Sequence, residues 1–153
     1  MLTFNTVVQA KIVHYFAGIM AAKSGGGIIL VSSFTAYGPI PYLAEYCSSK
    51  SFQLVFGEAL HYELKAKNID VLVLCPGITK SERVSFGVDA EPVVDLALRS
   101  LGKRASVLPG WKNNWDVFVG RYLKSRKRYL HDYGRRLEKL IAGHKLPRPA
   151  DSP

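Results

Sequence analysis

Two short, continuous apolar runs constrain the fold of this 153-residue chain more than any other feature. They are Ile28–Val31, which ends in Ser32-Ser33, and Ile69–Leu74, which ends in Cys75-Pro76-Gly77. Short runs without polar alternation are typical of strands that are buried on both faces. Parallel strands need a helical crossover between them, and the intervening sequence is long enough to provide one. The pattern therefore predicts an α/β fold built on a parallel sheet.

Three predicted helices alternate with these strands, over residues 2–22, 45–67 and 91–101, and a last short strand is expected at 105–108. The Gly-rich stretch Ser24–Gly27 is interpreted as a plain connector that ends the first helix. The apolar faces of the first two helices are assigned to residues spaced three or four apart. These residues are Val8, Ile12, Phe16, Ile19 and Met20 in the first helix and Phe52, Val55, Phe56, Ala59, Leu60 and Leu64 in the second.

Composition narrows the class and the setting. Hydrophobic residues make up 48% and charged residues 22% of the chain, as in ordinary globular proteins. With only Cys47 and Cys75, no disulfide framework is indicated, and a reduced, intracellular setting is expected. The apolar N-terminal stretch contains polar residues and lacks a signal-peptide pattern, so neither a leader nor a membrane span is predicted. We therefore expect a cytoplasmic protein, with membrane association as the alternative location.

The net charge of +9 belongs mostly to the C-terminal segment. Residues 111–153 hold eleven Lys or Arg and four Asp or Glu, whereas the remaining 110 residues are nearly balanced. We expect a basic, aromatic helical extension over 111–145 and a disordered tail over 146–153. Its basic face could lie on an anionic membrane surface; nucleic-acid binding is disfavoured because no recognition fold accompanies it. The histidines, which lie at His14, His61, His131 and His144, show no metal-ligand spacing, so no metal is predicted.

The carboxyl ends of the two predicted strands are the candidate site, because function gathers there in open parallel sheets. Tyr46 and Lys50 open the intervening helix at i, i+4 spacing, which places both side chains on one helix face. A nearby ammonium favours phenolate and so lowers the pKa of a phenol, which suits proton donation to a developing alkoxide. Ser33, at the end of the first strand, could hold the carbonyl oxygen against that phenol.

This constellation resembles the short-chain dehydrogenase/reductase family. Tyr46-Cys-Ser-Ser-Lys50 matches the family's Tyr-x-x-x-Lys motif, Ser33 rather than Ser32 matches its catalytic serine, and Asn5 matches the asparagine of its tetrad. The resemblance implies Tyr46 as general acid, Lys50 as its pKa-lowering partner and ribose ligand, and Asn5 as the support for a proton-relay water. The stretch from Ala44 to Leu60 looks most like the branch of very-long-chain 3-oxoacyl-CoA reductases and 17β-hydroxysteroid dehydrogenases.

The same resemblance implies a cofactor and a partner. The loop after the second strand would grip the nicotinamide end of NADP or NAD, with the preference left open; its residues are Pro76, Gly77, Ile78 and Thr79, with Ser81 where the family commonly has Thr. The substrate would be an apolar ketone or a 3-oxoacyl compound. A homo-oligomer through the helices 2–22 and 45–67 is also implied, since their apolar residues exceed what one sheet face can cover.

The departures from the family are as informative. The strand and Gly-rich turn that cradle the pyrophosphate have no counterpart here. We therefore expect residues 1–110 to form the C-terminal half of a Rossmann-like reductase domain, a partial parallel sheet without its N-terminal βαβ half. An alternative of a different class is a catalytically silent fragment or scaffold that retains the fold and pairs with another chain. A third is a peripheral membrane module that uses the basic helix.

Overall fold

The structure, a computed structural model, describes residues 1–82 and 84–143 and confirms the α/β class. Its three strands are all parallel and lie in the order β1-β2-β3: β1 (Gly26–Val31), β2 (Ile69–Leu74) and β3 (Ser106–Val107). Register along β1 and β2 runs from Gly26 opposite Ile69 to Val31 opposite Leu74. The predicted disordered tail over 146–153 lies outside the described residues.

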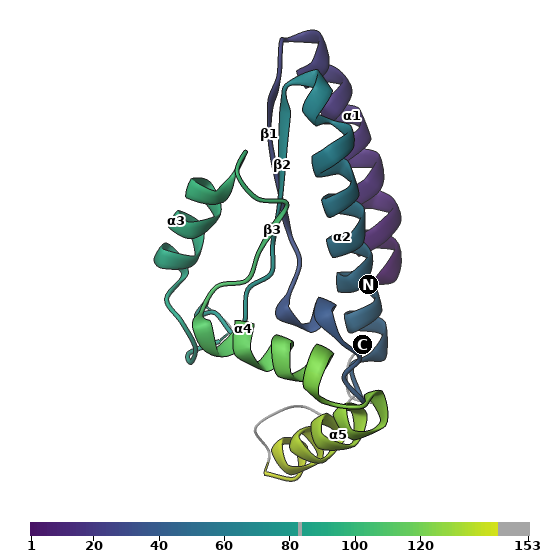
Figure 1. Cartoon of the computed structure of the whole chain (residues 1–153), viewed down its shortest axis with the longest axis vertical. Coiled ribbons are helices and arrows are strands. Elements are labelled where there is room, and N and C mark those ends of the chain that lie inside the picture. The colour runs from purple at the N-terminus through teal and green to yellow at the C-terminus, as the bar shows by residue number, and fades with distance from the viewer. Residues whose placement is uncertain (83, 144–153) are drawn as a thin grey trace.

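Helices cover both faces of this sheet. Their bounds are α1 (Gln9–Ala22), α2 (Ala44–Glu63), α3 (Ala90–Ser100), α4 (Trp111–Phe118) and α5 (Arg126–Ala142). Three short turns extend helices: π-helical η1 (Phe4–Val8) and η4 (Val119–Leu123), and the 3-10 turn η3 (Lys65–Lys67). A second 3-10 turn, η2 (Phe34–Tyr37), lies in the loop between β1 and α2. Figure 1 shows α1 and α2 side by side along one face and α3 on the other, while α4 crosses the end of the sheet and leads to α5.

Strand β2 is the centre of the core because its side chains are buried on both faces. Val71 and Val73 are fully buried on the side of α1 and α2, where Val73 packs with Leu30 and Leu54. The alternate residues Leu72 and Leu74 pack against Val93 and Ala97 of α3. The side chains of successive strand residues point to opposite faces, so a run without polar alternation is what a doubly covered strand requires.

Part of the predicted apolar faces of the first two helices does not pack on the sheet. Ile12 and Phe16 of α1 are about half exposed, at 50% and 48%, and Val55 of α2 is 67% exposed. The residues that pack on the strands include Val13 and Leu54 as well as the small Ala17, and Gly57 lies where α2 approaches the strands closely. A Cβ on Gly57 would lie 2.3 Å from Val73 Cγ2 and 2.9 Å from Leu30 Cδ1.

Strand β1 begins at Gly26, two residues earlier than the apolar run indicates. Its first amide donates to the carbonyl of Asn68 at 3.1 Å, so pairing with β2 begins inside the glycine cluster. Gly25 adopts φ +126°, and a Cβ there would lie 2.4 Å from Asn68 O. Asn68 itself adopts the left-handed conformation, at φ 61°, which ends the α2–η3 segment where the sequence predicts a stop. The connection from α1 to β1 and the connection from α2 to β2 therefore contact each other through Gly25, Gly26 and Asn68.

The segment from α4 to α5 is packed far more loosely. Among its described helical residues only Gly134 is buried, and large aromatic side chains stay exposed, with Trp111 at 75% and Trp115 at 57%. Across the described ranges 1–82 and 84–143, no helix is both long and apolar enough to cross a bilayer. The aromatic face of this segment is therefore a surface feature.

Candidate active site

The loops after β1 and β2 are joined by backbone hydrogen bonds, which brings the predicted site residues to one rim. The amide of Ser32 donates to Leu74 O at 2.8 Å, and that of Phe34 donates to Pro76 O at 2.9 Å. Helix α2 begins a few residues later, at Ala44, and runs back along the same two strands (Figure 1). The rim is thus fixed by sheet pairing rather than by side chains.

Tyr46 and Lys50 lie together on the first turns of α2. Lys50 Nζ is 5.8 Å from the centroid of the Tyr46 ring, as their i, i+4 spacing predicts. The ammonium also donates to Val31 O at 3.1 Å, at the carboxyl end of β1. Burial lowers the pKa of Lys50 from its ordinary value, and the Cys75 side chain opposes that shift. The pair therefore forms a cation beside a phenol at the end of the sheet.

The two serines after β1 have different hydrogen bonds. The hydroxyl of Ser32 donates to the backbone carbonyl of Lys50 at 2.8 Å and so ties α2 to the strand. The Ser33 oxygen accepts from the amide of Thr35 at 3.2 Å, which caps η2 and leaves its O–H without an acceptor in the described part of the chain. Ser33 and Tyr46 make no hydrogen bond with each other within residues 1–82 and 84–143. The free O–H makes Ser33 the better of the two to contact a substrate.

Asn5 reaches the site from η1. Its Nδ2 donates to Ser49 Oγ at 3.1 Å, and Ser49 Oγ donates to the carbonyl of Tyr46 at 2.8 Å. Ser49 is fully buried, so this link between η1 and α2 is shielded from water. Asn5 lies in a π-helical turn, a geometry frequent at functional sites.

Gln53 is a member of the cluster that the sequence interpretation omitted. It is only 3% exposed. Its Oε1 accepts from Lys50 Nζ at 3.0 Å, and its Nε2 donates to the carbonyl of Asn5 at 3.2 Å. The available signal was a polar residue three positions after Lys50, on the same helix face and inside an otherwise apolar stretch.

The loop after β2 contains the predicted cofactor-binding residues. Thr79 Oγ1 donates to Gly77 O at 3.2 Å, and Thr79 forms an isolated parallel bridge with Val88. Ser81 forms a second isolated bridge, antiparallel, with Val84. Ile78 is 55% exposed, so it borders open space rather than the core.

Burial also raises the pKa values of the two cysteine thiols. Cys47 and Cys75 are both buried free thiols. Burial raises the pKa of Cys75 to about 11, so this thiol is neutral at pH 7 although its charge would otherwise affect Lys50. Within the residues that the structure describes, no group of three His, Cys, Asp or Glu side chains could hold a metal ion.

An apolar trough of about 640 Å³ runs along β1 and ends at Lys50 and Gln53. Its far wall is the exposed face of η1 and α1, including Ile12 and Phe16. The edge of β1 opposite β2 has no strand partner among the described residues. Four residues of the predicted apolar face of the first helix thus line this trough: Val8, Ile12, Phe16 and Met20.

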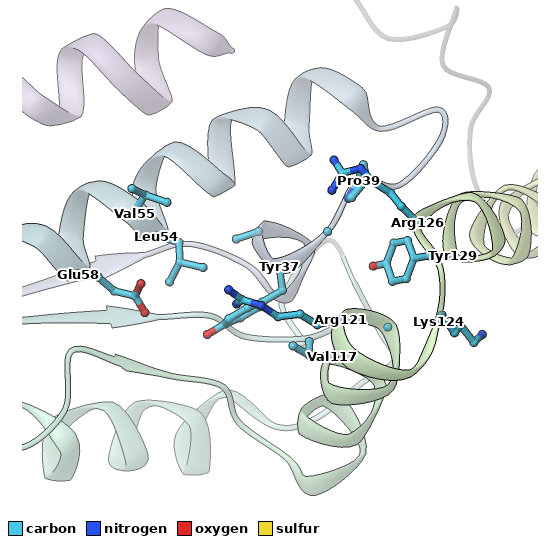
Figure 2. Close-up of a pocket in the computed structure, with 13 residues that line it drawn as sticks. Tyr37, Pro39, Leu54, Val55, Glu58, Val117, Arg121, Lys124, Arg126 and Tyr129 are labelled. Carbon is cyan, nitrogen blue, oxygen red and sulfur yellow. The ribbon is translucent and has the colours of Figure 1, made fainter.

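A second cavity, of about 440 Å³, lies between α2, η2 and the start of α5 (Figure 2). Arg121 extends from η4 toward Tyr37, and Glu58 borders the space from α2. Burial raises the pKa of Tyr37 above its ordinary value. None of the predicted site residues lines this cavity, so it is separate from the rim of Tyr46 and Lys50.

Comparison with known proteins places the chain in a family. The family model described as short chain dehydrogenase matches residues 1–90, well over half of the chain, and the chain therefore belongs to the short-chain dehydrogenase family. A 7β-hydroxysteroid dehydrogenase of Mediterraneibacter gnavus is 30% identical over 131 residues, covering 76% of this chain and 50% of the relative. A very-long-chain 3-oxoacyl-CoA reductase of Meyerozyma guilliermondii is 33% identical over 109 residues, covering 67% of this chain and 32% of the relative.

Solved structures agree on the fold. A structure reported in a study of 7β-hydroxysteroid dehydrogenase stereoselectivity superposes with a TM-score of 0.80 at 28% identity, covering 87% of this chain and 56% of that one. A short chain dehydrogenase from Burkholderia cenocepacia, solved in complex with NADP, gives a TM-score of 0.69 at 23% identity, covering 80% and 54%. The chain spans about half the length of the 7β-hydroxysteroid dehydrogenase relatives and of these structures.

Proposed function

We propose that this chain supplies the catalytic half of an NAD(P)(H)-dependent oxidoreductase that reduces an apolar ketone or a 3-oxoacyl substrate. One observation carries the proposal: the Lys50 ammonium lies 5.8 Å from the Tyr46 ring at the rim where β1 and β2 end. Membership of the short-chain dehydrogenase family supports the same chemistry. The 7β-hydroxysteroid and 3-oxoacyl relatives point to carbonyl groups on large apolar molecules.

In this mechanism Tyr46 donates its phenolic proton to the carbonyl oxygen as negative charge develops there. Lys50 favours the phenolate that remains, since each unit by which a pKa is lowered corresponds to about 1.4 kcal/mol. Ser33 donates its free O–H to the same oxygen and holds it near the phenol. Asn5 fixes the backbone of Tyr46 through Ser49, at 3.1 Å and 2.8 Å.

The residues fit the nicotinamide-ribose end of the cofactor, which when bound supplies the hydride. Lys50 uses two donors on protein carbonyl oxygens, at 3.1 Å and 3.0 Å, and keeps a third for a ribose hydroxyl. Thr79 and the exposed Ile78 lie in the loop after β2, where the nicotinamide would bind. No described strand is followed by a Gly-rich turn that could cradle a pyrophosphate, so we assign that role to the other half of the domain.

The direct test joins the missing half to this chain. A chimera carries the N-terminal cofactor-binding half of the M. gnavus 7β-hydroxysteroid dehydrogenase before residue 1, and NADPH and NADH oxidation is followed with ketosteroid and 3-oxoacyl substrates. We expect turnover that falls at least about a thousandfold in Tyr46→Phe, because the donated proton is lost. Tyr15→Phe, on an exposed part of α1, is the matched control and should leave the rate unchanged.

A chimera that binds NADPH but reduces no ketone would favour the catalytically silent scaffold. A separate prediction concerns cofactor binding by the isolated chain. It should bind NADPH and NADH at least about a thousandfold more weakly than the chimera, because several charge-assisted phosphate contacts of about 1.5–3 kcal/mol each would be missing. Micromolar affinity of the isolated chain in a fluorescence titration would instead indicate a self-sufficient enzyme.

The open edge of β1 and its trough are assigned to the same missing half. The backbone groups of β1 on that edge have no strand partner among the described residues, and the trough beside them is mainly apolar. Unpaired strand edges associate with other strands. We expect the isolated chain to aggregate or to pair through this edge, and the chimera to suppress that behaviour in size-exclusion chromatography.

Self-association through residues 2–22 and 45–67 is a further part of the proposal. Val55 and Tyr62 of α2 are 67% and 86% exposed, and Tyr15 of α1 is 65% exposed. Exposed apolar surface of this extent is typical of interfaces. Light scattering of the chimera should give a dimer or larger assembly, and Val55→Lys should reduce its mass. A monomeric chimera at micromolar concentration would contradict this assignment.

A second candidate function is docking on an anionic membrane, favoured by the aromatic face of the C-terminal segment. Trp111, Trp115 and Tyr122 are 75%, 57% and 67% exposed, and Phe118 stacks between the last two with ring centroids 5.8 Å and 5.3 Å apart. Residues 111–143 hold nine basic and three acidic residues. Aromatic rings beside clustered cations are typical of helices that lie on anionic bilayers.

Vesicle sedimentation tests this docking. The chain should bind vesicles of phosphatidylcholine with phosphatidylglycerol and not vesicles of phosphatidylcholine alone. Trp115→Ser should weaken that binding several-fold, whereas Tyr62→Ser, an exposed aromatic on α2, should not. Equal binding to both kinds of vesicle, or none, would remove the membrane function.

A further inference from the structure

The side chain of Gln53 lies between two groups that define the active-site rim. Lys50 Nζ donates to its Oε1 at 3.0 Å, and its Nε2 donates to the carbonyl of Asn5 at 3.2 Å. The carboxamide therefore connects Lys50 to Asn5 without an intervening molecule. At 3% exposure it is shielded from bulk solvent on this path.

This arrangement differs from the one that the family resemblance implies, in which Asn5 supports a proton-relay water. A water molecule can accept a proton on one side and release another on the opposite side. A carboxamide accepts only at its oxygen and donates only at its nitrogen, so it fixes the direction of both hydrogen bonds. A group of this kind orients its neighbours but does not carry a proton between them.

We infer that Gln53 is a positioning residue for Lys50, and that its carboxamide takes the place of the relay water between Lys50 and Asn5 in this chain. The inference rests on the proposed function for the roles of Tyr46 and Lys50. One consequence is that the phenol of Tyr46, which is partly exposed, regains its proton from solvent directly rather than through Lys50.

The chemical reason for glutamine at this position is its neutrality. The acceptors of Lys50 are the carbonyl of Val31 and the amide of Gln53, and no carboxylate lies within 4 Å of Nζ among the described residues. The other titratable groups facing the ammonium are Tyr46 on the same helix and Cys75 after β2, whose thiol is neutral at pH 7. The ammonium is thus held in place by neutral acceptors, 5.8 Å from the centroid of the Tyr46 ring.

Two size-matched substitutions test this role in the chimera, in which the open edge of β1 is covered, without any cofactor. Gln53→Glu puts a carboxylate on the ammonium, and Gln53→Met removes both hydrogen bonds with little change in volume. Lysine side chains are labelled with carbon-13, and the resonances of Lys50 are assigned by their loss in Lys50→Arg. The titration midpoint of Lys50 is then measured by NMR, with far-UV circular dichroism to verify that each variant is folded.

Gln53→Glu should raise the titration midpoint of Lys50 by about one pH unit, because the new anion stabilises the ammonium. Gln53→Met should lower the midpoint of Lys50, because the ammonium loses an acceptor. Gln9→Glu is the matched control: Gln9 lines the same trough but has no hydrogen bond to Lys50, so the midpoint of Lys50 should move by less than half as much.

Shifts of Lys50 in the same direction in both Gln53 variants, or shifts no larger than those of Gln9→Glu, would overturn the inference, since a purely structural role gives no opposite signs. The outcome is separable from the proposed function. Opposite shifts in a chimera that reduces no ketone would reject ketone reduction and leave the Gln53–Lys50 coupling in place.

Discussion

The sheet-bearing part of the chain, residues 1–110, and the segment from 111 to 143 differ in how they are held. The first is nearly neutral and buries its central strand on both faces, with Ile69, Val71, Leu72 and Val73 at 0% exposure. The second carries six excess positive charges, buries only Gly134 among its described helical residues, and keeps its aromatic rings exposed. Packing therefore specifies the first part, whereas the second has much of its apolar surface available for a partner.

Matched leucine substitutions should show the largest contrast between the two parts. Leu72→Ala removes a fully buried side chain that packs on Val93 and Ala97, and should cost about 2–5 kcal/mol of unfolding free energy. Leu123→Ala, at a residue 64% exposed, should cost less than about 0.5 kcal/mol. Urea unfolding followed by circular dichroism measures both, and similar costs would contradict the comparison.

Matched glycine substitutions should give effects of opposite sign. A Cβ on Gly57 would clash with Val73 and Leu30, so Gly57→Ala should destabilise by about 1–3 kcal/mol. At Gly134 the nearest atom to a Cβ is Pro41 Cγ at 3.5 Å, an ordinary contact, so Gly134→Ala should stabilise by about 0.5–1 kcal/mol through helix propensity. The thermal midpoints should move apart, and a stabilising Gly57→Ala would mean that α2 is not seated closely on the sheet.

Acid should loosen the C-terminal segment before the sheet. Lys124 Nζ donates to Asp132 Oδ2 at 2.5 Å, and this hydrogen bond lowers the pKa of Asp132. A carboxyl whose folded pKa is depressed contributes stability above its unfolded pKa of about 3.9, and that contribution is lost as the pH falls through the folded value. The protection of α5 amides, taken relative to the intrinsic exchange rate at each pH, should therefore fall below about pH 4.

The matched variants for this smallest effect are Lys124→Met and Lys127→Met. At pH 7 the first should raise exchange in α5 modestly, because the ion pair is lost, while the second should leave it unchanged. Equal exchange in both variants would show that the pair does not hold the segment.

Much of the fold could be predicted from the sequence because it depends on strongly local patterns. The apolar runs that became β1 and β2, the crossover helix between them and the stop at Asn68 are all where the pattern indicates. The start of β1 at Gly26 could not be predicted, because glycine does not favour strands and the pairing depends on Asn68, which lies far along the chain, immediately before β2.

The residue types of the candidate site stand out in the sequence, but the hydrogen bonds that join them do not. Spacing alone places Tyr46 beside Lys50, since i, i+4 neighbours share a helix face. The role of Gln53 depends on η1 being packed against α2, a tertiary contact without a local signature. Ile12 and Val55 are exposed although both belong to predicted apolar helix faces. Periodicity identifies an apolar stripe on a helix, but it does not say whether the sheet or a partner covers that stripe.

Both tryptophans, Trp111 and Trp115, lie in α4, outside the sheet-bearing part. Intrinsic tryptophan emission of this protein therefore reports the environment of the C-terminal segment alone. Ellipticity in the far ultraviolet averages over every helix and strand. If the segment melts on its own, the emission transition will precede the ellipticity transition, and a single all-or-none description of unfolding will fail for a structural reason.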